Sequence, residues 1–290
     1  MSLQGLTAAV VGTALSAFGA NILNQWREAD LDRLMVRTCE RPLPAGRISS
    51  RQAATWGIVT AAIGLLILAV GTNWLTTSLS LFVIILYVLV YTPLKVRTPL
   101  NTVIGAVCGA IPPMMGWTAA TGRLDAGAWI HGGIHFAWQI PHFLALAWLY
   151  REDYARGGFR MLPAVDSEGR LTARLAFLYA AALLPITAAL SAFGVTGGAF
   201  LVTSQAVGLA FVGLGWVFLR TRNQPTARRL FLASIIYLPV LLGLMVVDMD
   251  DRAVRGGEIS VAASGSTDSN LEVATNLSKG CLLYTSDAAD

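Results

Sequence analysis

Charged residues are scarce in this sequence. They account for 13% of the 290 residues, whereas 55% of the residues are hydrophobic and the mean hydropathy is +0.60. A soluble domain usually has about 25% charged residues, so this composition excludes a domain that covers its surface with charge and predicts a membrane protein. The net charge of +4 is small, and basic loops at one membrane face explain it without a nucleic-acid partner.

Cysteine and histidine are also rare, with three residues of each. Cys39, Cys108 and Cys281 do not have the spacing of metal ligands, and the first two lie in or beside apolar segments. This usage excludes a disulfide framework and a cysteine-held metal centre. We expect a structural role for each cysteine.

Long apolar runs recur along the chain. A helix needs about 20 apolar residues to cross the hydrocarbon layer of a membrane. Eight runs meet this requirement, and they predict an all-α, polytopic transmembrane helix bundle. We place them at residues 5–26, 52–71, 74–92, 99–121, 126–150, 172–193, 198–219 and 229–247.

The composition changes after Asp248, where Gly, Ser, Asp and Asn replace the apolar pattern. We therefore expect a membrane domain over residues 1–249 and a disordered tail over 250–290. Residues 281–290 resemble translated sequencing-adapter read-through, and we expect them to be non-native.

Basic residues are concentrated in alternate connections between the apolar runs. Seventeen of the 21 Lys and Arg residues lie in four connections, while the intervening connections contain only Arg123. Basic loops stay on the cytoplasmic side of a membrane. The pattern therefore predicts that these four connections are cytoplasmic and that both termini lie outside. The four are residues 27–51, 93–98, 151–174 and 220–229.

Four oxygen-bearing side chains share one face at the end of the first apolar run. If the helix continues, Asn21, Asn24, Glu28 and Asp32 fall within an arc of roughly 80°. Carboxylates and carboxamides suit a hard cation such as Mg²⁺. The alternative is a solvated helix beside the membrane that is held by acid–base pairs at helical spacing.

Cationic side chains follow this acidic face. Arg37, Arg41 and Arg47 lie just downstream, and guanidinium groups make bidentate contacts to phosphate oxygens. A short loop between two prolines adds Lys95 and Arg97 near one point. Acidic residues that could bind a metal, followed by basic residues that could bind phosphate, predict a diphosphate site at the end of a membrane helix.

These motifs resemble the UbiA superfamily of intramembrane prenyltransferases. Asn24, Glu28 and Asp32 match its N-x-x-x-D-x-x-x-D motif, with Glu in the middle position. The run that starts at Met35, MVRTCERPLPAG, is similar to the M-x-R-T-x-x-R-P-L-x-x-G pattern of the haem o synthase branch, the protoheme IX farnesyltransferases. Further segments that resemble this branch are residues 97–117, 138–143, 150–163 and 234–239.

The sequence departs from the family pattern at a few places. Val96 and Ile140 replace a usually basic residue and a usual proline, and Gly157 replaces a usual alanine. The family usually has nine spanning helices. We therefore expect the helix that precedes the first motif helix to be missing from this sequence, which begins without the basic segment of a signal peptide.

The resemblance implies a set of site residues. The 150–163 segment corresponds to the second acidic motif, so Glu152 and Asp153 are expected to supply oxygen ligands and Arg156 to meet phosphate. The implied Mg²⁺ ligands are Asn24, Glu28, Asp32 and Asp153. The implied diphosphate-binding residues are Arg37, Arg41, Lys95, Arg97 and Arg156. The implied catalytic residues are Asn21, Asn24, Glu28, Asp32, Arg37, Arg41 and His142.

His142 follows Pro141, which removes a backbone hydrogen bond and is expected to kink the helix and open a polar pocket. An ionisable residue at membrane depth is a site candidate. His142 is a base, a contact to haem propionate or iron, or a hydrogen-bonded core residue, and the family match favours a functional role, catalytic or haem-binding. His131 and His135 lie within about 40° of it on the helical wheel, which would suit a haem face, but separate roles are favoured.

The function that the resemblance implies is transfer of the farnesyl group of farnesyl diphosphate to a vinyl group of protohaem IX, which makes haem o. The alternatives are another UbiA-type aromatic or quinone prenyltransferase and a non-catalytic membrane haem-binding protein. The resemblance also implies a bacterial inner membrane protein with its active site on the cytoplasmic side. The partners it implies are membrane lipid and a haem a synthase or a terminal oxidase assembly.

Overall fold

The computed structural model describes residues 1–249, so the predicted tail over 250–290 lies outside the described residues. Within residues 1–249 the named elements are all helices. They are α1 (Leu3–Asp32), α2 (Ser50–Gly71), α3 (Trp74–Ile85), the π-helix η1 (Leu86–Tyr91), α4 (Thr92–Leu94), α5 (Asn101–Thr121), α6 (Ala126–Leu149), α7 (Arg151–Arg156), α8 (Leu162–Val165), α9 (Arg170–Ala192), α10 (Gly198–Thr221) and α11 (Gln224–Val247).

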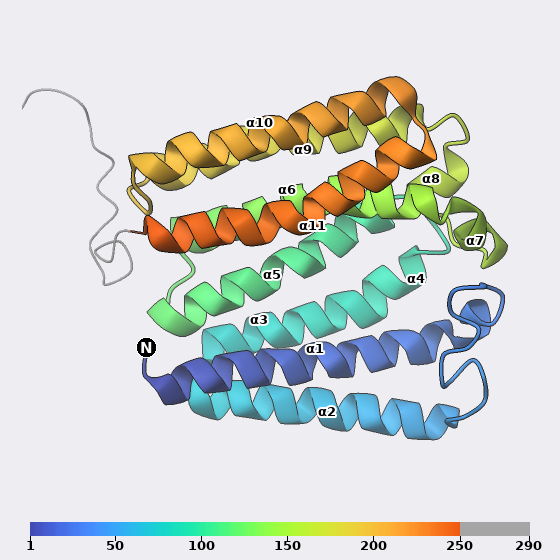
Figure 1. Cartoon of the computed structure of the whole chain (residues 1–290). Coiled ribbons are helices and arrows are strands. Elements are labelled where there is room, and N and C mark those ends of the chain that lie inside the picture. The colour runs from blue at the N-terminus through green and yellow to red at the C-terminus, as the bar shows by residue number, and fades with distance from the viewer. Residues whose placement is uncertain (250–290) are drawn as a thin grey trace, which may run out of the picture. The chain divides into compact units, whose positions relative to one another are not determined.

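All eight predicted apolar segments are helical. Of the helices within the described part, seven are long and apolar enough to cross a membrane, with α3, η1 and α4 counted as one. The exception is α6, which has 24 residues and runs alongside the others (Figure 1). It is not counted among the seven because Gln139 and three histidines make its sequence too polar. The helix continues through Pro141.

The long helices form two groups. In the first, α1 packs against α2 and α3 packs against α5; in the second, α6 packs against α9 and α11, and α10 packs against α9 and α11. The α5–α6 contact joins the groups (Figure 1). The largest cluster of buried hydrophobic residues lies mainly in the second group, around Leu144, Leu183 and Phe218, and extends to α5. Residues of α1 and η1 in the first group line the two cavities of the candidate site described below.

Small residues bring α1 and α2 into close contact. A Cβ atom placed on Gly19 would lie 2.4 Å from the Ala61 nitrogen, and one placed on Gly64 would lie 2.4 Å from the Ser16 nitrogen. Both clashes involve backbone, which a rotamer change cannot relieve. In a membrane, close packing through small residues replaces the hydrophobic effect as the force between helices.

We expect Gly19→Ala to lower the free energy of unfolding by about 2 kcal/mol, because α1 and α2 must separate to admit the methyl group. Titration with sodium dodecyl sulfate in mixed micelles would measure this change. The control is Gly213→Ala in α10, where an added Cβ meets nothing within 4 Å; it should be neutral or stabilise by up to about 1 kcal/mol. Equal losses in both variants would contradict the packing argument.

The π-helix η1 interrupts the third spanning segment, and the sequence analysis did not predict it. Thr92 explains its position, because its N–H and its hydroxyl both donate to the carbonyl of Tyr87, the hydroxyl at 2.8 Å. Pro93 has no N–H and cannot continue the α-helical ladder. The wider turn lets the rings of Tyr87 and Tyr91 stack, with centroids 5.2 Å apart. Single π-helical turns often mark functional positions.

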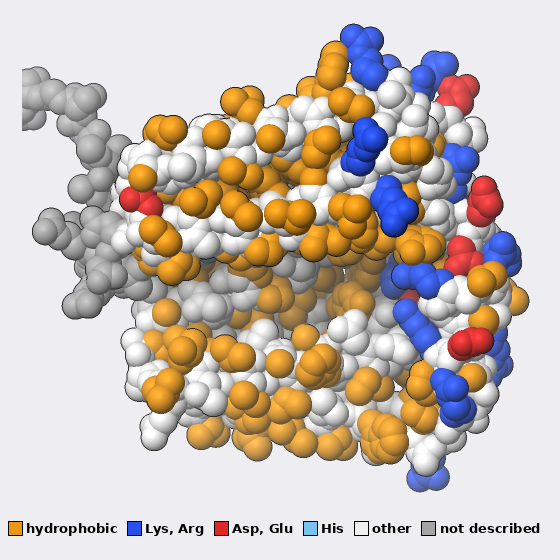
Figure 2. Space-filling model, in the orientation of Figure 1, with side chains coloured by type: hydrophobic (Ala, Val, Ile, Leu, Met, Phe, Trp, Pro, Cys, Tyr) orange, Lys and Arg blue, Asp and Glu red, His pale blue; other side chains and the backbone are white. Residues whose placement is uncertain are grey.

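Two loops with candidate residues meet at one end of the bundle. The loop that follows α1 lies beside α7 (Figure 1), and Asp153 accepts a hydrogen bond of 2.9 Å from the Val36 N–H. Figure 2 shows that Lys and Arg side chains gather at this end, while the sides of the bundle are largely hydrophobic. The two acidic motifs therefore lie at the same end of the helices, as a shared site requires.

Candidate active site

The acidic face of α1 points into the protein. Asn24, Glu28 and Asp32 are 6%, 5% and 2% exposed, and with Asn21 they line one cavity of about 200 Å³. Residues four apart on a helix lie on one side, so the predicted grouping of these side chains is confirmed. Asn24, Glu28 and Asp32 have buried side chains, so the alternative of a solvated helix beside the membrane is wrong for these three residues.

Each buried acid on this face has a cationic partner. Lys95 Nζ lies 2.9 and 3.0 Å from the two carboxylate oxygens of Glu28, and Arg41 donates to Asp32 at 2.8 Å. A buried carboxylate without such a partner would be strongly destabilising. Lys95 and Arg41 also line the cavity, together with Arg37. The site therefore contains a compensated set of acids and cations.

Asn24 has a fixed orientation in the cavity. Its amide nitrogen donates to the Thr92 hydroxyl at 2.9 Å, and that hydroxyl donates to the Tyr87 carbonyl. Because the nitrogen is engaged, the carbonyl oxygen of Asn24 is the atom that remains for a ligand. The π-helical turn and the acidic helix are thus connected by one chain of hydrogen bonds.

The structure places Asp153 outside the cavity that Glu28 and Asp32 line. Its carboxylate accepts from the backbone N–H groups of Val36 and Arg37 at 2.9 and 3.3 Å and pairs with Arg156 at 3.0 Å. Asp153 and Arg156 line a neighbouring cavity of about 490 Å³, and Arg37 lines both cavities. Asp153 thereby holds the loop that carries Arg37.

The remaining predicted cations do not line the acidic cavity. Arg97 is exposed, and its backbone carbonyl accepts from Arg160. Arg47 is also exposed and donates to the Glu40 carbonyl at 2.6 Å. Only Arg37, Arg41 and Lys95 of the predicted phosphate-binding residues therefore converge with the acids of α1.

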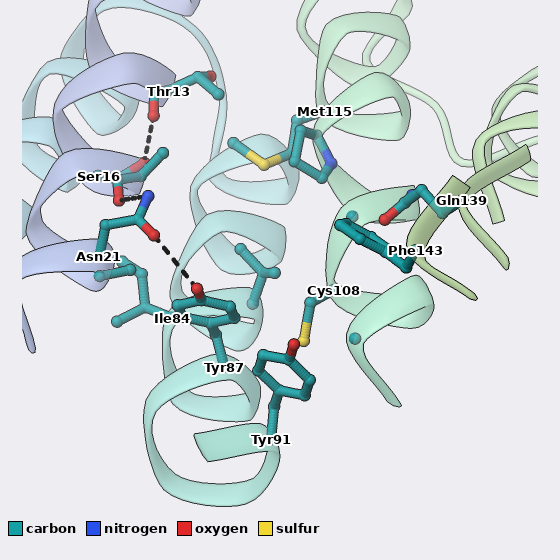
Figure 3. A pocket seen from close by; sticks show the side chains of 16 residues that line it. Thr13, Ser16, Asn21, Ile84, Tyr87, Tyr91, Cys108, Met115, Gln139 and Phe143 are labelled. Carbon is teal, nitrogen blue, oxygen red and sulfur yellow. Dashed lines mark hydrogen bonds between the residues drawn. The ribbon is translucent and has the colours of Figure 1, made fainter. Parts of the chain in front are cut away.

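A second, mainly apolar cavity of about 310 Å³ adjoins the acidic one. Asn21, Tyr87 and Tyr91 line both cavities, and the Tyr87 hydroxyl donates to Asn21 at 3.2 Å (Figure 3). Figure 3 shows the apolar side, with Ile84, Met115 and Phe143 around the space. A polar cavity and an apolar cavity therefore share a border of two tyrosines and an asparagine.

The tyrosines are functional candidates that the sequence analysis missed. Tyr91 lies under Lys95, whose Nζ is 4.7 Å from the ring centroid. Tyr154 also lines the acidic cavity and accepts from Arg37 at 3.1 Å. The available signal was the spacing of Tyr87, Tyr91 and Lys95 at four-residue intervals, which places them on one side of a helix.

His142 lies on α6 and packs against α11, within the second group of helices. Its Nδ1 is 2.7 Å from the Ser234 hydroxyl, which itself donates to the Phe231 carbonyl at 2.6 Å. The hydroxyl has one proton, so it must accept from His142. The histidine proton therefore lies on Nδ1, and Nε2 keeps its lone pair. Trp138 and Phe231 hold the ring, at centroid distances of 4.9 and 5.0 Å.

His131 and His135 lie apart from His142. They line an open groove of about 410 Å³ with residues of α5 and α11. Their Nδ1 atoms contact the carbonyls of Gly127 and His131 at 2.8 and 3.0 Å. This placement agrees with separate roles for the histidines.

The donor set of the acidic cavity fits Mg²⁺ that arrives with a diphosphate. Within residues 1–249 no group of three or more His, Cys, Asp or Glu side chains forms a metal centre from protein ligands alone. Mg²⁺ is commonly held by one or two carboxylates plus substrate phosphates. Glu28, Asp32 and the Asn24 oxygen match that type of site.

The chain is similar to known proteins over most of its length. Residues 1–237 match the model of the UbiA prenyltransferase family. The chain is 40% identical over 248 residues to the protoheme IX farnesyltransferase of Solibacter usitatus, covering 86% of this chain and 85% of the relative. It is 44% identical over 235 residues to the protoheme IX farnesyltransferase of an Anaeromyxobacter species, covering 81% and 77%.

Two solved structures share the fold. A digeranylgeranylglyceryl phosphate synthase aligns with a TM-score of 0.72 at 15% identity, over 86% of each chain. A UbiA homologue from Aeropyrum pernix K1 aligns with a TM-score of 0.63 at 19% identity, over 83% of this chain and 91% of the other. The chain therefore belongs to the UbiA prenyltransferase family, where its relatives are protoheme IX farnesyltransferases.

Proposed function

We propose that this protein transfers the farnesyl group of farnesyl diphosphate to a vinyl group of protohaem IX, which yields haem o and free diphosphate. The observation that carries the proposal is the shared border of the two cavities at Asn21, Tyr87 and Tyr91. A prenyl diphosphate has a charged head and an apolar tail. The acidic cavity with its cations suits the head, and the apolar cavity suits the tail.

The reaction begins with cleavage of the bond between C1 of the farnesyl group and the diphosphate oxygen. Arg37, Arg41 and Lys95 line the cavity and stabilise the charge that develops on the leaving oxygens. Asn24, Glu28 and Asp32 are the residues that would hold Mg²⁺, whereas Asp153, expected from the second acidic motif to be a ligand, lies outside this cavity and holds the loop that carries Arg37. Bound Mg²⁺ would supply Lewis-acid stabilisation of the same leaving group.

The allylic cation then forms a carbon–carbon bond with the vinyl group, and water adds to the resulting carbocation with loss of a proton. Premature capture of the allylic cation by water would give farnesol instead. The lining of the 310 Å³ cavity is largely apolar, with Ile84, Pro112, Met115 and Phe143 among its residues, and excludes water from the reacting carbon.

His142 is the proposed haem contact. Its Nδ1–H bond to Ser234 leaves Nε2 as the atom that would bind iron or accept a proton. Residues that orient a metal-binding histidine typically contribute 10- to 100-fold to affinity.

We expect Ser234→Ala to weaken haem binding by about tenfold or more, because His142 loses the acceptor that fixes its ring. A titration of the haem absorbance band measures the affinity. Ser204→Ala is the control, because Ser204 is equally buried but lies on α10 and donates only to the Leu201 carbonyl. Similar losses in both variants would remove the basis for an orienting role of Ser234.

The test of the proposed function uses membranes that contain the full chain. They are incubated with protohaem IX, farnesyl diphosphate and Mg²⁺, and the products are analysed by mass spectrometry. The mass of haem o supports the proposal. Haem binding without any prenylated haem would contradict it and favour a haem-binding protein, while prenylation of an added quinone in place of haem would favour a different acceptor.

We also propose that the protein is located in the bacterial inner membrane, with this site on the cytoplasmic side and with a haem a synthase or terminal oxidase as the recipient of the product. The supporting observation is the concentration of Lys and Arg at the end of the bundle that carries the site (Figure 2). Basic residues mark the cytoplasmic face of a membrane protein.

A further inference from the structure

A groove of about 740 Å³ lies between the end of α6 and the start of α11. Leu146, Leu149 and Phe231 give it apolar walls, and Arg228 and Arg229 supply the charge. Among the residues that the structure describes, no Asp or Glu lines it. This composition suits an anionic, largely apolar ligand.

The two arginines are available for such a ligand. Both are exposed, and within residues 1–249 neither takes part in a side-chain hydrogen bond or an ion pair of the structure, in contrast to Arg41, Lys95 and Arg156. Adjacent guanidinium groups present several donors, which match the geometry of carboxylates.

The groove is connected to the proposed reaction site. Phe231 lines the groove and packs against His142, with ring centroids 5.0 Å apart. Leu149, Tyr150 and Gln224 line both this groove and the 490 Å³ cavity that contains Arg37. A ligand in the groove would therefore contact Phe231, the ring that packs on His142, and would lie next to the loop that contributes to the acidic cavity.

We propose that this groove binds the two propionate carboxylates of the porphyrin acceptor, through Arg228 and Arg229, while the ring lies on the apolar walls toward His142. The inference rests on the proposed function, which makes protohaem the acceptor. Protohaem carries both carboxylates on one edge and its vinyl groups away from that edge. If the carboxylates bind at the basic end of the bundle, the vinyl groups point toward the membrane interior. The apolar cavity lies in that direction.

The groove with His131 and His135 is a less suitable place for the carboxylates. It has a similar apolar lining, with Pro113, Trp117 and Leu242, but among residues 1–249 no Lys or Arg lines it. Two carboxylates bound there would be desolvated without a cationic partner.

The test compares ferric protoporphyrin IX with its dimethyl ester, which has the same ring but no carboxylate charge. The full chain is placed in nanodiscs of phosphatidylcholine without farnesyl diphosphate, and both ligands are titrated by the haem absorbance band. We expect the wild type to bind the diacid about tenfold more tightly than the diester, as two exposed charge pairs would give. In the Arg228→Gln/Arg229→Gln variant this ratio should fall to about one.

Two controls make the result specific. Arg220→Gln should keep the wild-type ratio, because Arg220 packs on Trp216 at 4.5 Å and does not line the groove. An unchanged affinity for the diester in the double variant would show that the variant is folded. A ratio that is the same in the wild type and the double variant, or that falls equally in Arg220→Gln, would overturn the proposal.

The outcome is separable from that of the proposed function. If the wild type prefers the diacid through these arginines but makes no haem o, the carboxylate site stands and the transferase function fails. If it makes haem o and the ratio does not depend on Arg228 and Arg229, the function stands and the site fails.

Discussion

Asp32→Asn is expected to reduce farnesyl transfer at least 100-fold in membranes supplied with protohaem, farnesyl diphosphate and Mg²⁺. Asp32 is 2% exposed, lines the acidic cavity and pairs with Arg41 at 2.8 Å. The amide keeps the shape of the side chain but removes the charge that would hold Mg²⁺ and that positions Arg41. Loss of one preorganised electrostatic contact to a developing charge typically costs about 10²- to 10³-fold in rate.

Asp30→Asn is the matched control. Asp30 is two residues away on the same helix, but its side chain is 92% exposed and its partner Arg33 is also largely exposed. Because exposed pairs contribute little, this variant should keep nearly wild-type activity. The measurement is haem o formation per amount of correctly inserted protein, determined by size-exclusion chromatography. If Asp32→Asn is as active as the wild type, the interpretation of this helix face as catalytic is wrong.

Much of this helix face could be predicted from the sequence because the information is local. The spacing of Asn24, Glu28 and Asp32 fixes their common direction once the segment is helical. The direction of that face is less local, because Arg27 and Asp30 on the other sides of the same helix end are also charged but exposed. The exposures of Asn24, Glu28 and Asp32, which are 6%, 5% and 2%, show that the shared face is buried, which the spacing alone left open.

The helices were predictable for a similar reason. Each apolar run must form a helix because a membrane provides no other partner for the backbone N–H and C=O groups. The π-helical turn was not predictable from hydrophobicity, because it depends on one hydroxyl, that of Thr92, and on the missing N–H of Pro93. The spacing of Tyr87, Tyr91 and Lys95 places them on one side of a helix, but it does not show that the tyrosines border two cavities.

Loop residues were the least predictable part of the site. The short loop before α5 predicts that Lys95 and Arg97 project near one point, but only Lys95 lines the acidic cavity. The carboxylate of Asp153 binds backbone N–H groups of the loop after α1, and nothing in the order of residues identifies such a partner 117 positions away. Contacts of this kind depend on how the two groups of helices pack.

The pair formed by Glu28 and Lys95 is expected to have the largest effect on stability. Glu28 and Lys95 side chains are 6% and 14% exposed, and their charged atoms lie 2.9 Å apart. Lys95→Met leaves a buried carboxylate without its cation, which typically costs about 3–5 kcal/mol. We therefore expect a loss of about 3 kcal/mol in the free energy of unfolding, measured by titration with sodium dodecyl sulfate in mixed micelles.

The double variant Glu28→Gln/Lys95→Met should recover most of this loss, because a buried ion pair can be replaced by neutral residues at little cost when both charges are removed together. Arg97→Gln, an exposed change in the same loop, should stay within about 0.5 kcal/mol of the wild type. Farnesyl transfer should nevertheless remain lost in the double variant, because neither the metal-binding carboxylate nor the phosphate-binding ammonium is restored. If the double variant recovers both stability and activity, the pair serves only to hold α1 against the loop. If it recovers stability but stays inactive, the two charges have a catalytic role that is distinct from their structural role.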